Sequence, residues 1–340
     1  MHGPDRQAAL AQWRRARQIP FDAIPMIDMG AFLDGSDRRG VAQKIGAACR
    51  SVGFLYLTNH GIPTELIDAA MAQTRRFFAL PLDRKLEIHI DKSRAHRGYF
   101  PLFEENTDPG EHADFKEGFD LARDLPPGHP DVTADKPLHG PNLWPDDLPD
   151  FRATIESYYA ELMRLAERLM EAFALSLDLE EDFFHGMIDQ AMGALRLLHY
   201  PPQAATVIDN AVGCGAHTDY GCLTILAQDS NGGLQVQNTV GEWIAAPPVP
   251  GAFVVNLGDQ MARWTNDVFA ATPHRVINLS GRERYSMPFF YEPNYDALIR
   301  CLDTCRSTDD PPKYAEVVAG EYLLSRFNDT FSYRAPAQPG

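Results

Sequence analysis

Two side chains that commonly bind metal ions, His217 and Asp219, stand two positions apart in the segment Gly-Ala-His-Thr-Asp-Tyr. Alternate residues of an extended chain face the same side, so an imidazole and a carboxylate would converge here. A third candidate ligand, His274, follows 57 residues later in the segment Thr-Pro-His-Arg-Val. A return after several strands of a barrel would bring it to the same place. The three residues together indicate a metal site.

Two histidines and one carboxylate are the ligand set of non-haem Fe(II) oxygenases. The three ligands occupy one face of an octahedron and leave the opposite positions open for substrates and O₂. A tetrahedral zinc site would leave at most one open position. The ligand set therefore favours iron and oxygen chemistry.

Arg284 and Ser286 alternate in the same way, ten residues after His274. The planar guanidinium of arginine binds a carboxylate through paired hydrogen bonds, and serine adds a hydroxyl donor beside it. Alone, a His-x-Asp or an Arg-x-Ser pattern is more typical of an exposed strand. Together they predict an iron site beside a pocket for a co-substrate that carries a carboxylate.

The composition disfavours several classes of protein. The 340-residue chain is 44% hydrophobic and 23% charged, which is typical of a folded globular protein. Its net charge of −16 disfavours nucleic acid and anionic membranes as partners. Neither a signal-peptide pattern nor an apolar run of about 18 residues occurs. The odd number of cysteines, five, favours reduced thiols and a cytoplasmic location. No obligatory protein partner is evident, and a small-molecule substrate is expected.

Hydrophobic periodicity predicts helices in the first half of the chain, at 37–51, 65–79 and 151–175, and short strands at 24–28 and 54–57. The last helix carries an apolar stripe that predicts core packing. Its members are Ile155, Tyr159, Leu162, Ala166, Leu169 and Phe173.

From Gly193 onward, short strands separated by turn residues replace the helical pattern. They are expected at 195–200, 222–228, 234–237, 243–245, 253–257, 274–278 and 285–291. Many short strands at regular spacing predict an antiparallel sandwich or barrel. The fold class that these patterns predict is mainly β with helical support.

Residues 91–150 are rich in Pro, Gly and Asp and contain few periodic segments. A long irregular stretch is typical of a functional loop, and we expect a lid here. Its aromatic residues either close over the substrate or form a separate hydrophobic cluster. These residues are Tyr99, Phe100, Phe103 and Phe115.

Several motifs in the same order make the chain resemble the 2-oxoglutarate/Fe(II)-dependent dioxygenases of the isopenicillin N synthase-like family, over nearly its whole length. The motifs are Ile-Pro-Met-Ile-Asp at 24–28, Gly-Phe-Leu-Tyr-Leu-Thr-Asn-His-Gly-Ile at 53–62, His217-Thr218-Asp219, Asn-Leu-Gly-Asp at 256–259, His274-Arg275-Val276 and Arg284-Tyr285-Ser286. Segments 139–145, 216–221 and 272–274 are similar to the microbial branch, which includes ethylene-forming enzymes and pyrimidine-type hydroxylases.

This resemblance implies a distorted double-stranded β-helix, or jelly roll, with N-terminal α-helices. We divide the chain into a leader at 1–23, a helix-rich support region at 24–190, a jelly-roll core at 191–300 and a C-terminal segment at 301–340. We expect one structural unit overall.

The resemblance also implies roles for individual residues. His217, Asp219 and His274 match the ligands of Fe(II). Arg284 and Ser286 match the pair that binds the distal carboxylate of 2-oxoglutarate. Further matches are Tyr200, near the co-substrate, and three residues at substrate positions of plant relatives, Arg196, Phe290 and Glu292. From the predicted lid we add Tyr99 and Phe100 as substrate contacts. Leu198 and His199 depart from the Asn and Tyr of the plant pattern.

The implied reaction consumes O₂ and 2-oxoglutarate, releases succinate and CO₂, and hydroxylates, desaturates or cyclises a small-molecule metabolite. Three alternatives stay open. The protein could be an oxidase of the isopenicillin N synthase type that needs no 2-oxoglutarate, an ethylene-forming enzyme, or a ligand-binding jelly roll without catalysis.

Overall fold

The computed structural model describes residues 24–107, 114–202, 213–278 and 280–334. The predicted leader at 1–23 and the last six residues of the C-terminal segment lie outside these ranges. The described part contains a large eight-stranded sheet. Its order is β1 (Met26–Asp28), β2 (Phe54–Thr58), β10 (Phe253–Leu257), β7 (Leu223–Gln228), β12 (Arg284–Tyr291), β5 (Ala194–Tyr200), β4 (Glu117–Ala122) and β3 (Gly98–Phe100).

A second sheet has four strands. Its order is β6 (Cys214–His217), β11 (His274–Val276), β8 (Leu234–Gln237) and β9 (Trp243–Ala245). Buried side chains from both sheets form one hydrophobic cluster, in which Leu226, Val254 and Tyr200 of the large sheet pack with Val236 and Val276 of the small one. The two sheets therefore face each other. A short hairpin is formed by β13 (Leu298–Ile299) and β14 (Val317–Val318).

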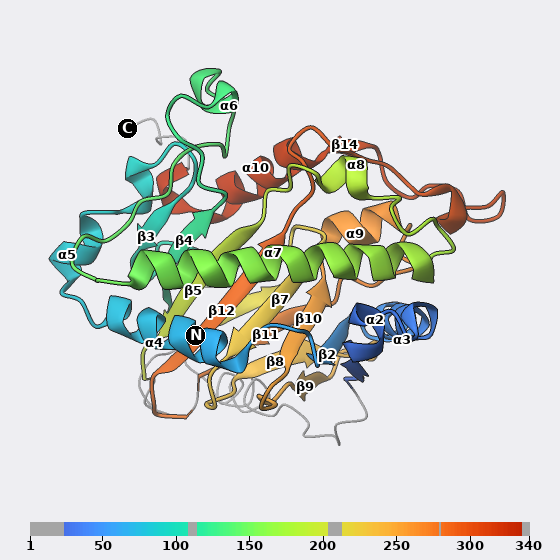
Figure 1. The fold of residues 1–340 in the computed structure, drawn as a ribbon, viewed down its shortest axis with the longest axis horizontal. Coiled ribbons are helices and arrows are strands. Elements are labelled where there is room, and N and C mark those ends of the chain that lie inside the picture. The colour runs from blue at the N-terminus through green and yellow to red at the C-terminus, as the bar shows by residue number, and fades with distance from the viewer. Residues whose placement is uncertain (1–23, 108–113, 203–212, 279, 335–340) are drawn as a thin grey trace, which may run out of the picture.

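Helices cover the other face of the large sheet, and α7 crosses its strands (Figure 1). The longer helices are α3 (Arg38–Ser51), α4 (Thr64–Phe78), α7 (Phe151–Ser176) and α10 (Ala319–Thr330). The short ones are α2 (Gly30–Leu33), α5 (Leu82–Leu86), α6 (Pro130–Thr133), α8 (His185–Ile188) and α9 (Asp259–Trp264), with 3-10 turns η2 (Ile90–Lys92), η3 (Asp303–Cys305) and η4 (Ser332–Arg334). No described helix is long and apolar enough to cross a bilayer.

Each central strand divides its side chains between two environments, because successive residues point to opposite faces. Leu195 and Leu197 of β5 join the core under the helices, whereas Arg196, Leu198 and Tyr200 face the space between the sheets. The strands are buried on both faces, so they lack a simple alternation of polar and apolar residues.

The predicted helices at 37–51, 65–79 and 151–175 are confirmed within one residue at each end, and the α7 stripe is buried apart from the half-buried Tyr159. The predicted strands are confirmed within two residues. The description of 91–150 as irregular is wrong in part, because β3 and β4 extend the large sheet there. All six residues of β4 are buried, which removes the period-two signal of a strand. The strand β6 was also not predicted.

Candidate active site

A cavity opens between the two sheets, and residues from both sheets line it. The large sheet contributes alternate residues of β5 and β12, and the small sheet contributes the histidines at the end of β6 and the start of β11. Helix α10 adds Leu323 and Phe327. The cavity therefore combines side chains that are far apart in the sequence.

His217, Asp219 and His274 meet on the wall of this cavity. The Nε2 atoms of His217 and His274 lie 3.7 Å and 3.6 Å from Oδ1 of Asp219. One donor atom from each residue falls within 4.8 Å of the others. The three predicted metal ligands are thus brought together by the fold.

The remaining polar atoms of these three side chains are engaged elsewhere. The Nδ1 atoms of His217 and His274 lie 2.8 Å and 3.2 Å from the backbone carbonyls of Gly215 and Thr272. When each Nδ1 carries the hydrogen and donates it to the carbonyl, each Nε2 is left with a free lone pair.

The carboxylate of Asp219 is oriented in a similar way. Its Oδ2 accepts hydrogen bonds from Asn256 Nδ2 at 2.6 Å and from Thr224 Oγ1 at 2.5 Å. This leaves Oδ1 directed toward the two imidazoles. Burial opposes the ionisation of Asp219, but the two histidines and these hydrogen bonds hold its pKa below its usual range.

His274 is held as a neutral imidazole. Burial, followed by the charge of His217, lowers the pKa of His274 to about 4. Burial opposes the charged form of His217 as well, but Cys214 and Asp219 raise the pKa of His217 to about 10, so a metal ion that binds there must displace a proton from its imidazole. A neutral imidazole is the form that binds metal ions. Two imidazole nitrogens and one carboxylate oxygen, each oriented by a further hydrogen bond, suit Fe(II) with open coordination positions.

Arg284 is a buried cation on β12, with 1% of its surface exposed. It donates hydrogen bonds to the Gly232 carbonyl at 2.6 Å, to Ser286 Oγ at 3.1 Å and to Gln228 Oε1 at 3.3 Å. Its guanidinium lies 4.7 Å from the centre of the Tyr200 ring. Within the described residues no carboxylate pairs with it, so the group is suited to the carboxylate of a ligand.

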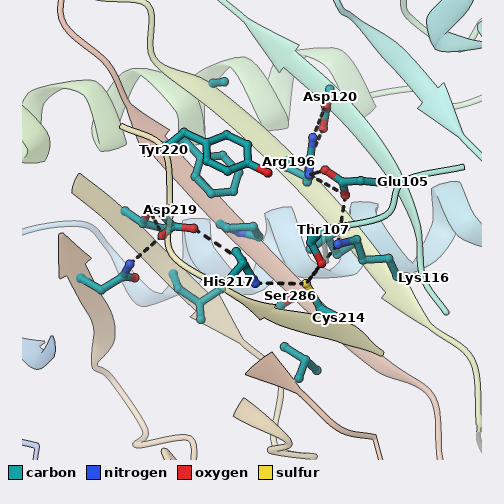
Figure 2. Close-up of a pocket in the computed structure, with 18 of the residues that line it drawn as sticks. Glu105, Thr107, Lys116, Asp120, Arg196, Cys214, His217, Asp219, Tyr220 and Ser286 are labelled. Carbon is teal, nitrogen blue, oxygen red and sulfur yellow. Dashed lines mark hydrogen bonds and ion pairs between the residues drawn. The ribbon is translucent and has the colours of Figure 1, made fainter. Parts of the chain in front are cut away.

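Arg196 lines the cavity, but its guanidinium is already paired. It contacts both oxygens of Asp120, at 2.7 Å and 2.8 Å, and both oxygens of Glu105, at 2.9 Å and 3.0 Å. Figure 2 shows Glu105 between Arg196 and Lys116, whose ammonium lies 3.0 Å from the Glu105 carboxylate. Arg196 is therefore a structural cation rather than a free anion receptor.

Of the remaining predicted substrate contacts, the structure places Phe290 and Glu292 on the cavity wall but not Tyr99 or Phe100. The Tyr99 hydroxyl donates to Glu117 at 2.6 Å, and its ring packs against Phe77 in the core under the helices. Phe100 is fully buried beside the guanidinium of Arg196. Their assignment as substrate contacts is corrected accordingly, because the sheet directs both rings into packed cores.

Sequence reasoning missed several wall residues, including Glu105, Lys116, Asp120, Cys214, Tyr220 and Phe327. Lys116 directly precedes β4 and Asp120 lies within it, four residues later and so on the same face of an extended chain, a pattern that the missed strand concealed. Lys116 Nζ also donates to Cys214 Sγ at 3.2 Å, and Cys214 lies beside His217 (Figure 2). None of the five cysteines, all of which lie in described segments, forms a disulfide.

Comparisons with known proteins agree with this geometry. Residues 24–147 match the family model described as the non-haem dioxygenase in morphine synthesis N-terminal, and residues 191–293 match the 2OG-Fe(II) oxygenase superfamily. A relative from Emericella nidulans, the 2-oxoglutarate-Fe(II) type oxidoreductase hxnY, is 38% identical over 91% of this chain and 90% of its own length.

Two further similarities concern a plant enzyme and a fungal structure. The rice homoarginine-6-hydroxylase 2-ODD-233 is 37% identical over 92% of this chain and 98% of its own. A full-length Neurospora crassa protein, crystallised in complex with alpha-KG (2-oxoglutarate), has a TM-score of 0.82 and 32% identity, over 92% of this chain and 98% of that one. A second structure of the same fungal protein also contains thymine.

The chain belongs to the 2OG-Fe(II) oxygenase superfamily. It is an Fe(II)- and 2-oxoglutarate-dependent dioxygenase that uses O₂, and its core is the distorted double-stranded β-helix of this family. The family, fold class, enzyme class and cofactors predicted from the sequence are confirmed.

Proposed function

We propose that His217, Asp219 and His274 hold Fe(II), and that Arg284, Ser286 and Tyr200 hold 2-oxoglutarate, while a small-molecule substrate lies against Phe290 and Glu292. One observation carries this proposal: the three oriented donor atoms share a cavity with a buried arginine that has no carboxylate partner within the described residues. We also propose a cytoplasmic location, which the reduced thiols support.

The protein supplies geometry and a dry pocket for the reaction. Bound Fe(II) supplies the oxygen chemistry that couples decarboxylation of 2-oxoglutarate to oxidation of a substrate C–H bond, with succinate and CO₂ as products. Arg284 neutralises the distal carboxylate of the co-substrate, and Ser286 adds a hydroxyl beside it. Because Asn256 and Thr224 hold Asp219, the ligand set keeps its orientation while substrates enter.

Succinate release tests this function. Protein loaded with Fe(II) under anaerobic conditions receives 2-oxoglutarate and then air, with and without a pool of small metabolites. We expect succinate formation that requires iron and increases when the metabolite pool is added. Fractionation of the pool would then identify the substrate. Oxygen consumption without succinate would instead indicate the 2-oxoglutarate-independent oxidase, and ethylene release would indicate the ethylene-forming reaction.

A further inference from the structure

Glu292 follows directly after β12 and lines the cavity at the opposite end of the strand from Arg284. Only 2% of its surface is exposed. Its Oε2 atom has no hydrogen-bond partner within the described residues, and no cation there forms an ion pair with it. A buried carboxyl group without a partner is costly, so its retention on a cavity wall indicates a group that recognises a ligand.

The backbone makes room for this carboxyl group. A Cβ atom at Gly221 would lie 2.1 Å from Glu292 Oε1, so a side chain at position 221 would displace the carboxyl group. Within the described residues, Glu292 therefore stands as an acidic group without a cationic partner beside the proposed metal site.

The other charges on the substrate side of the wall are balanced. Lys116 pairs with Asp114 at 2.8 Å and with Glu105 at 3.0 Å, and Arg196 pairs with Glu105 and Asp120. Arg97 donates through Nη1 and Nη2 to the carbonyls of Ala95, His96 and Leu138. Lys116 and Arg196 thus pair with three carboxylates and Arg97 is held by backbone carbonyls, and Glu292 adds a fourth acidic group.

This balance decides the charge of a complementary ligand. A carboxylate or phosphate on the substrate would have to compete for cations that are already engaged. Arg196 and Lys116 pair with carboxylates, the Nη atoms of Arg97 are bound to three backbone carbonyls, and Arg284 serves the co-substrate. Burial, followed by the charges of Asp219 and Asp259, raises the pKa of Glu292 to about 8. A positive group placed against the carboxyl group would relieve this cost, since opposite charges attract strongly in a buried site.

We propose that the substrate carries a cationic nitrogen group, an ammonium or a guanidinium, and that the Glu292 carboxylate is the specificity-determining residue that binds it. This inference rests on the proposed function. It names the chemical class of the substrate, which the ligand set for iron and 2-oxoglutarate leaves open.

A matched set of three small molecules with no other charged group tests the charge preference. Pentylguanidine ends in a guanidinium, pentylurea in a neutral urea of nearly the same shape, and heptanoate in a carboxylate. Each is titrated calorimetrically into the anaerobic wild-type protein with Fe(II) and 2-oxoglutarate, and substrate-dependent succinate is measured in parallel. We expect the guanidinium compound to bind at least about tenfold more tightly than the other two. Preference for the neutral or the acidic compound, or binding of none, would overturn the assignment.

The variant Glu292→Gln assigns the preference to one residue. It keeps the shape of the side chain and removes its charge, so affinity for pentylguanidine should fall about 10- to 100-fold while affinity for pentylurea changes little. Glu171→Gln is the matched control, because Glu171 is a buried glutamate that pairs with Arg38 and Arg168 outside the cavity. Equal losses in both variants, or for both ligands, would contradict the role of Glu292.

A spectroscopic readout separates this inference from the proposed function. The chelate of 2-oxoglutarate with protein-bound Fe(II) absorbs visible light without any substrate. If the wild-type protein forms this chelate and shows no preference for the cation, only the substrate class is wrong. If the chelate does not form, the proposed iron and co-substrate site itself fails. The same absorption in Glu292→Gln shows that the variant is folded.

Discussion

His217 and His274 lie directly opposite each other on the antiparallel strands β6 and β11, with ring centroids 4.4 Å apart. The register of these two short strands therefore brings together two of the three metal-ligand candidates. A slip by one residue would turn one imidazole to the other face of the sheet. The third candidate, Asp219, follows β6 by two residues and is held from the large sheet by Asn256 of β10 and Thr224 of β7.

The hydrogen bond from Asn256 to Asp219 should matter for metal affinity. Asn256→Ala removes the 2.6 Å contact that directs Oδ1 toward the imidazoles. We expect Fe(II) to bind about 10- to 100-fold more weakly, as measured by anaerobic metal titration. Asn142→Ala is the control, because Asn142 is a buried asparagine that bonds to the Ala122 backbone outside the cavity. Similar losses in both variants would point to general destabilisation instead.

Arg284→Ala should raise the KM for 2-oxoglutarate. The variant removes the buried cation proposed to pair with the distal carboxylate. The lost binding free energy is about 2–4 kcal/mol, which corresponds to a rise in KM of roughly 30- to 1,000-fold. Arg50→Ala serves for comparison, because that guanidinium bonds to the Ser176 carbonyl away from the cavity. The KM is measured from succinate formation at varied 2-oxoglutarate concentration. An unchanged KM in Arg284→Ala would show that Arg284 does not bind the co-substrate.

Acid should weaken the network around Glu105. Burial alone would raise the pKa of Glu105, but Arg196 and Lys116 lower it to about 2. Since the folded pKa is below that of the unfolded chain, the pairing stabilises the protein above about pH 4.5 and is lost as the pH falls toward 2. At neutral pH, the free energy of unfolding of the wild-type protein should exceed that of Glu105→Gln by about 3 kcal/mol. Denaturant unfolding at several pH values should show this difference narrowing below about pH 4.5.

Glu292 should affect stability in the opposite direction to Glu105 as the pH changes. Its folded pKa, about 8, lies above that of the unfolded chain, so ionisation costs the folded protein stability as the pH rises from about 4.5 to 8. Without a ligand, the free energy of unfolding of Glu292→Gln should therefore rise by about 2–4 kcal/mol relative to that of the wild-type protein between about pH 5 and pH 8. The measurement is again denaturant unfolding, and a gain independent of pH would show that the carboxyl group is not buried as described.

Gly53 should not tolerate a side chain. Its φ is +69°, and a Cβ atom there would lie 2.3 Å from the carbonyl oxygen of Ala270. We expect Gly53→Ala to lower the free energy of unfolding by about 2–4 kcal/mol. At Gly35, φ is +82° but no atom lies within 4 Å of the added Cβ, so Gly35→Ala should cost only about 1–2 kcal/mol. Equal losses would show that backbone conformation alone, rather than the close contact, decides the effect.

Local patterns in the sequence were sufficient for much of this protein. The helices and most strands follow from hydrophobic periodicity and turn residues, because these depend on neighbours a few positions apart. The types and spacing of His217, Asp219 and His274 indicated the metal, and Arg284 with Ser286 indicated the carboxylate of the co-substrate. The family resemblance then supplied the fold. The strands β3 and β4 were not predicted, because short or wholly buried strands carry no alternation.

Only the tertiary structure decided which charges meet. Arg196 was expected to contact the substrate, but its partners Glu105 and Asp120 lie 91 and 76 residues away in the sequence. The same holds for Glu292, whose lack of a partner depends on every element that surrounds the cavity. Such pairings follow from strand register and sheet packing, which local sequence patterns do not encode. The sequence by itself therefore determined the chemistry of the metal and co-substrate, and the tertiary structure decided the charge of the substrate pocket.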